Sequence, residues 1–168
     1  MELNVTQKRE ISQLYETVRL YFGLAEEIKS DINSHISLKI SDISKFYETG
    51  SSVNKEIKSI NTFIAHLSSS AIRICTIYEV YGETNYRKKY KNEKNKNTII
   101  NEIENNLPEF IPFLLRDNIA HQENNKNILW ELRQDILNKL IVEDIYSSMK
   151  KAIANLNNFL QSKSSKDI

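Results

Sequence analysis

Apolar residues recur at alternating steps of three and four along almost the whole chain, and this spacing limits the fold more than any other feature. One such run extends from Ile11 to Ile32, and a more regular one begins at Val53. A step of three or four brings side chains back to the same face of an α-helix, so each run predicts one apolar stripe. The second run comprises Val53, Ile57, Ile60, Ile64, Leu67, Ala71, Ile74 and Tyr78.

Glycine and proline are too scarce for a fold that needs many tight turns. The 168 residues include 3 glycines and 2 prolines, whereas strand-rich folds need such residues at recurring hairpins. A chain of this length is long enough to bury one substantial core. We therefore expect an all-α, antiparallel up-and-down helical bundle with three or four long helices plus short helices. It forms one domain over residues 1–168, with a frayed tail at residues 162–168.

The expected helices have recognisable boundaries. We predict a helix over residues 6–30, an irregular join in which Ile36, Leu38 and Ile40 alternate by two, and a short helix over residues 41–48. A single long helix with a stutter over residues 6–48 is the alternative. Gly82 can close the second long helix in a left-handed conformation. Further along the chain we expect a loop at 83–97, a short helix capped by Thr98, a new helix starting near Pro112 and a bend near 141–144.

Charge and cysteine content indicate the setting of the chain. The net charge is +1, so no overall field attracts nucleic acid or anionic membranes, and such binding would need a local patch. The single cysteine, Cys75, cannot form an intrachain disulfide, and no apolar run approaches the roughly 20 residues of a membrane span. The first residues lack the apolar segment of a secretory signal. We expect a cytoplasmic protein without membrane contact, metal ligands or cofactor.

The stretch "LLRDNIAHQENN", residues 114–125, places Arg116 before His121 in an Arg-x4-His arrangement. The polar residues follow the apolar "PFLL", which would anchor a helix in the core. On a straight helix Arg116 and His121 point roughly 140° apart, whereas Asp117 and His121 share a face. The plainer interpretation is a histidine that caps carbonyls or fills a polar edge of the core, because so short a pattern also arises by chance.

These residues resemble the R-x4–6-H signature of the HEPN superfamily. Its members are all-helical bundles, and many are metal-independent ribonucleases of toxin and antiviral defence systems. The resemblance implies that Arg116 and His121 are catalytic, that Asp117 occupies the polar position after the arginine, and that two chains form a homodimer whose motifs face one cleft. Members silenced by a partner nucleotidyltransferase commonly carry a tyrosine two positions after the histidine. Here Glu123 stands at that position, which argues against that mode of silencing and leaves another silencing partner protein open.

An arginine and a histidine suit RNA cleavage because RNA carries its own nucleophile, the 2′-hydroxyl. Histidine can transfer protons near neutral pH, and arginine offers a planar, permanently charged fork to the phosphate. Asp117 could orient the imidazole or raise its pKa, although it could equally be an ordinary acid at a helix start. Asn118 could donate to the phosphate or merely end a turn.

The segment "NYRKKYKNEKNK", residues 85–96, is a second candidate for RNA contact. Its basic residues include Arg87, Lys88, Lys89 and Lys91, and Tyr86 and Tyr90 lie among them. Basic side chains with interleaved aromatic rings can follow a nucleic-acid backbone and stack on bases, but a solvated loop is the more usual meaning of such a run. His35 and His66 are expected to be structural or exposed. The leading hypothesis is an endoribonuclease, and the alternative is an inactive HEPN-like module that binds RNA or a partner protein.

Overall fold

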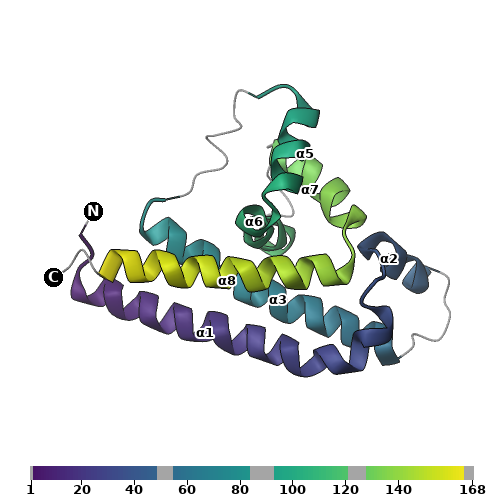
Figure 1. Ribbon diagram of the computed structural model, residues 1–168, viewed down its shortest axis with the longest axis horizontal. Coiled ribbons are helices and arrows are strands. Elements are labelled where there is room, and N and C mark those ends of the chain that lie inside the picture. Colours follow the sequence, from purple (N-terminus) through teal and green to yellow (C-terminus); the bar gives the residue numbers. More distant parts are fainter. Residues whose placement is uncertain (1, 49–54, 84–92, 121–127, 165–168) are drawn as a thin grey trace.

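The computed structural model describes residues 2–48, 55–83, 93–120 and 128–164, and within these ranges the chain is helical (Figure 1). The elements are α1 (Val5–Lys29), the 3₁₀ helix η1 (Ser30–His35), α2 (Ile40–Glu48), α3 (Lys55–Val80), α5 (Lys96–Asn105), α6 (Leu107–Ala120), α7 (Ile128–Lys139) and α8 (Val142–Ser164). The predicted all-α helical bundle is confirmed, since the described residues contain no β-strand. None of the described helices combines the length and apolar character that crossing a membrane requires.

The first long helix begins at a side-chain cap and follows the predicted stripe. The Asn4 side chain accepts a hydrogen bond from the Gln7 amide at 2.8 Å, and the Gln7 side chain accepts one from the Asn4 amide at 3.0 Å. This capping box satisfies two amides that a helix start leaves without partners. Ile11, Val18 and Ala25 are buried on one face of α1, at the three-and-four spacing that predicted the helix.

The segment between α1 and α2 is irregular because its backbone pairs with the segment that connects α7 to α8. The amide of Ile40 donates to the carbonyl of Leu140 at 3.0 Å, and the amide of Val142 donates to the carbonyl of Leu38 at 3.0 Å. Lys39 and Ile141 thereby form an isolated antiparallel bridge between the α2 and α8 starts. Residues 6–48 are thus separate helices and not one long helix, and the bend predicted at 141–144 coincides with the break between α7 and α8.

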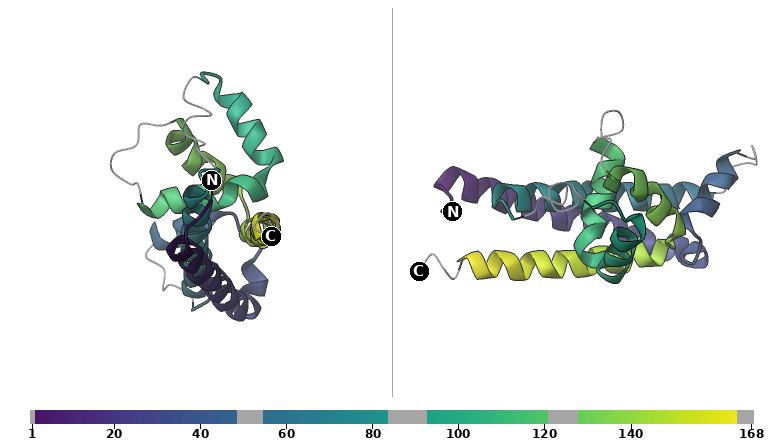
Figure 2. Two further views of the ribbon diagram at one scale, coloured as in Figure 1. Left: turned by 90° about the vertical axis from the view of Figure 1, so that its left-hand side faces the viewer. Right: turned by 90° about the horizontal axis from the view of Figure 1, so that it is seen from above.

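Helix α3 lies at the centre of the molecule. It packs against α1 on one side and against α6 and α8 on the other (Figures 1 and 2). Phe63, Leu67 and Ile74 of α3 are completely buried, and the buried Ser70 hydroxyl donates to the Val18 carbonyl of α1 at 2.9 Å. Gly82 closes this helix with φ +70°, as predicted, because glycine enters the left-handed region without steric cost.

Three predicted boundaries were wrong. Helix α6 starts at Leu107 and contains Pro112, because Pro108 occupies the first turn, where a missing amide proton costs little. Helix α5 starts at Lys96 with Asn95 as its cap, since the Asn95 side chain accepts from the Asn97 amide at 3.1 Å; Thr98 is therefore already inside the helix. Helix α8 continues to Ser164, where Lys163 pairs with Glu83 at 3.0 Å. Residues 162–164 are therefore helical, and the rest of the tail predicted to fray, residues 165–168, lies outside the described residues.

A tyrosine connects α8 to α1 at the edge of the core. Tyr146 is 7% exposed, its ring stacks on Phe22 with centroids 5.5 Å apart, and its hydroxyl donates to Glu26 at 2.9 Å. Burial, together with the hydrogen bond to Glu26, raises the pKa of Tyr146 from 10.0 to about 12. The folded protein therefore retains this proton at a pH at which the unfolded chain loses it.

The stability of the protein should fall above pH 10 through Tyr146. A pKa raised by folding stabilises the protein fully below pH 10, and this contribution is lost as the pH rises towards 12. Tyr146→Phe should cost about 1–2 kcal/mol at pH 8, through the lost hydrogen bond, and the wild type's advantage should shrink by about 1 kcal/mol by pH 11. Urea unfolding at both pH values measures this difference. A difference that stays constant between them would contradict the assignment.

Candidate functional site

Helix α6 carries the first residue of the Arg-x4-His motif and is firmly anchored. Phe110, Ile111, Leu114 and Leu115 are all buried, none more than 4% exposed. They form two adjacent pairs spaced by one helical turn, so one face of α6 is fixed against the core and its C-terminal turn emerges from that base. The predicted apolar anchor ahead of Arg116 is therefore present.

Arg116 lies at the edge of this core with its guanidinium occupied. Its Nη1 forms an ion pair with Oε1 of Glu79 on α3, and its charged carbon lies 5.3 Å from the centre of the Phe113 ring. The Arg116 side chain is 14% exposed, whereas that of Glu79 is 53% exposed. The carboxylate and the aromatic face therefore hold the arginine in place from two sides.

This geometry determines how Arg116 could bind a phosphate. A carboxylate and a phosphate use the same planar fork of the guanidinium, and little of the side chain is open to solvent. An RNA phosphate would have to displace or share Glu79, whose greater exposure makes it the partner able to move. The protein therefore holds the positive charge of Arg116 against a carboxylate of α3.

The other predicted site residues cannot be placed relative to Arg116. His121 lies outside the described residues, and so do Arg87, Lys88, Lys89 and Lys91. Asp117 and Asn118 belong to α6, which confirms their helical position, but their side chains lie outside the described part of the structure. The arrangement of the motif around a ribose-phosphate therefore stays a prediction.

A cavity of about 340 Å³ opens between α3, α6 and α8, on the Phe113 side of Arg116. Tyr78, Pro112, Phe113 and Phe159 line it together with the carboxylates of Glu83 and Glu109. Burial raises the pKa of Tyr78, and the nearby Cys75 and Glu109 act in the same direction. Apolar surfaces and carboxylates of this kind do not attract a phosphate, so the cavity does not extend the predicted RNA site.

Sequence reasoning missed Arg133, which α7 carries into the core. This arginine is 2% exposed, and within the described residues it is the one charged side chain that is buried. The signal was present, because Arg133 follows Leu129 by four positions and precedes Ile136 by three, which places it on the apolar stripe of α7. Arg133 lies twelve positions after His121, and a buried charge there is costly unless it is paired.

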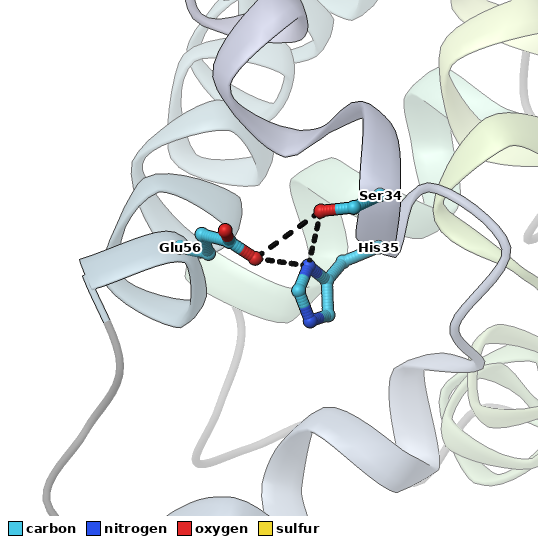
Figure 3. Close-up of polar contacts among 3 residues, drawn as sticks. All are labelled: Ser34, His35 and Glu56. Carbon is cyan, nitrogen blue, oxygen red and sulfur yellow. Dashed lines mark hydrogen bonds and ion pairs between the residues drawn. The ribbon is translucent and has the colours of Figure 1, made fainter.

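A cluster of Ser34, His35 and Glu56 was also missed (Figure 3). The Ser34 hydroxyl lies 2.9 Å from Nδ1 of His35 and donates to Oε2 of Glu56 at 3.2 Å, and the same Nδ1 pairs with Oε2 of Glu56. A hydrolytic triad needs its serine and its carboxylate on opposite ring nitrogens. Here both partners meet one nitrogen, so the cluster fastens the end of η1 to the first turn of α3, in agreement with a structural His35.

Metal chemistry has no candidate ligands in the described ranges, in which no three His, Cys, Asp or Glu side chains gather closely enough to hold an ion.

Comparison with known proteins gives no relative: neither a protein-family model, nor a curated protein, nor a solved structure matches the chain. Any function must therefore be argued from these residues alone.

Proposed function

We propose that this protein is a metal-independent endoribonuclease of HEPN type that acts as a homodimer in antiviral defence or a stress response. Arg116 binds the scissile phosphate, His121 transfers protons, and Asp117 orients the imidazole. Asn118 and the basic residues Arg87, Lys88, Lys89 and Lys91 contact the RNA. The proposal rests on the "RDNIAH" motif and on the resemblance that the motif carries.

The observation that supports this proposal most is the position of Arg116. A core-anchored helix brings its guanidinium to the molecular edge, and Glu79 and Phe113 fix its orientation. Preorganised positive charge is what a phosphorane intermediate requires. An arginine that only solubilised the surface would not need burial to 14% exposure or a carboxylate partner from another helix.

A non-catalytic RNA-binding module is the second candidate, and the same pairing favours it. Arg116 is mostly covered in the free protein and is already neutralised by Glu79. A domain that has lost its catalytic role could keep such an arginine as a structural link between α3 and α6. An RNA cleavage assay separates the two candidates, because the non-catalytic module binds RNA without cleaving it.

Incubation of the purified protein with labelled single-stranded RNA in excess EDTA tests the proposal. Cleavage should proceed in the chelator and leave 2′,3′-cyclic phosphate or 3′-phosphate ends, because the 2′-hydroxyl is the nucleophile. Mass spectrometry of the fragments identifies the ends. Binding without cleavage would transfer support to the non-catalytic module, and the absence of both would defeat both candidates.

Removing the carboxylate that occupies Arg116 should tighten RNA binding. We expect Glu79→Gln to lower the Kd for RNA by roughly threefold to tenfold, which corresponds to one charge-assisted contact released for a phosphate. Filter binding or fluorescence anisotropy at fixed salt measures the change.

Glu83→Gln provides the matched control for this measurement. Glu83 lies three residues beyond the end of α3, lines the cavity of about 340 Å³ and pairs with Lys163, so its loss raises the net charge equally without touching Arg116. The two variants should differ, with the large effect confined to Glu79→Gln. Equal effects would mean that general charge, and not the release of Arg116, governs binding.

A further inference from the structure

The outer face of α1 is exposed along the whole helix and carries an ordered pattern of charge. Lys8 and Arg9 lie in its first half, Glu26 and Glu27 lie in its last turns, and all four are exposed. Glu16 and Arg19, also exposed, lie in the middle. These residues fall on one side of the helix, because their spacing keeps them between about 40° on one side and about 60° on the other side of Ser12. The buried residues Ile11, Val18 and Ala25 lie roughly 120° around the helix from Ser12.

This charge pattern is complementary to itself in the antiparallel direction. Arg9 and Glu26 lie equally far along the helix from a point between Thr17 and Val18, on either side of it, and so do Lys8 and Glu27. Glu16 and Arg19 exchange places under the same rotation. A second α1 laid antiparallel on the first would therefore place opposite charges against each other at both ends and at the centre. A two-fold dimer requires such a self-complementary surface.

Gly23 gives independent evidence that another chain approaches this face. It lies inside α1, where glycine costs stability relative to alanine. An added Cβ at Gly23 would meet no atom of the chain within 4 Å, so the fold itself does not require a glycine. In the antiparallel arrangement the half-buried Gly23 lies opposite the small, exposed Ser12, and two small residues let helix backbones approach closely.

A groove beside this face can accept side chains from the second copy. It has a volume of about 520 Å³ and lies between α1 and Ile153 of α8. It shares Tyr15 with a neighbouring groove of about 560 Å³ near the start of α1. Leu20 is 57% exposed on the groove rim, so the rim offers an apolar side chain to a second copy of the chain.

We propose that a second copy of this chain docks antiparallel on the outer face of α1 and forms a two-fold dimer. Helix α1 has 25 residues and is about 38 Å long, so a single strip of this kind buries less than the roughly 800 Å² per partner of a standard interface. The dimer is therefore a weak, reversible one in the micromolar range.

This contact is distinct from a dimer that joins two motif clefts. Helix α6 lies on the opposite side of α3 and α8 from α1 (Figures 1 and 2), so an α1 dimer keeps the two α6 helices apart. The inference does not rest on the proposed nuclease activity, and its test uses no RNA.

Charge exchange at the centre of the interface tests the dimer. Arg19→Glu places glutamates against glutamates, and Glu16→Arg places arginines against arginines. In sedimentation velocity each variant alone should show a Kd raised at least tenfold over the wild type, at concentrations up to about 100 µM. An equimolar mixture of the two variants should dimerise again, and so should the double variant Glu16→Arg/Arg19→Glu. A wild type that stays monomeric, or a mixture that does not recover, overturns the proposal.

Gly23→Ala separates the interface from the fold. The variant should raise the melting temperature, because alanine is the better helix former and has room, while it weakens dimerisation severalfold. Circular dichroism melts and sedimentation measure the two effects. An unchanged or tighter dimer in Gly23→Ala contradicts close approach at this position.

Discussion

His121→Ala should reduce RNA cleavage by about 10³-fold or more while the protein remains folded. Proton transfer by a positioned histidine contributes roughly 10² to 10⁴ in rate, and His121 is the histidine of the motif. The residual rate should lose its dependence on pH near neutrality, because alanine has no titrating group. Single-turnover cleavage in EDTA across pH 5–9 measures both effects, and a circular dichroism melt verifies the fold.

His35→Ala is the control for this experiment. It also removes an imidazole, but one that links Ser34 to Glu56 of α3 far along the chain from the motif. We expect it to lower the melting temperature slightly and to leave cleavage per folded molecule unchanged. Cleavage that survives His121→Ala, or that falls equally in both variants, would remove the histidine from the proposed mechanism.

The helices were predictable because each has a local cause. Repeating apolar steps, the glycine at 82 and the two-residue alternation at 36–40 are all visible in the sequence, and each corresponds to a feature of the structure. Two of the three errors arose at helix starts. Pro112 was interpreted as a start when it lies in the second turn of α6, since a helix already anchored by Phe110 and Leu114 tolerates one missing amide donor.

The candidate site was less predictable because its partners come from distant residues. The motif identified Arg116, but not that Glu79 on α3 would occupy its guanidinium, since a pair 37 positions apart leaves no periodic signal. The same holds for Ser34 and Glu56, which are 22 positions apart. Tertiary packing decides these contacts, and sequence spacing describes only what lies along one helix.

Phe63→Ala should destabilise the protein by about 3–5 kcal/mol, the range for removing a large aromatic side chain from a packed core. Phe63 is completely buried on α3, and its ring centre lies 5.9 Å from that of Tyr146 on α8. Tyr146 in turn stacks on Phe22 of α1, so the cavity would loosen all three long helices together. Domains are typically stable by only about 5–15 kcal/mol, and this one change would remove a large share. Urea unfolding measures the change in the free energy of unfolding.

Two variants serve as controls. Phe63→Leu should cost only about 1 kcal/mol because it keeps most of the volume, and Val5→Ala, at a residue 75% exposed, should stay within about 0.5 kcal/mol. A cost below about 1 kcal/mol for Phe63→Ala would mean that the α1–α3–α8 contact does not hold the core together.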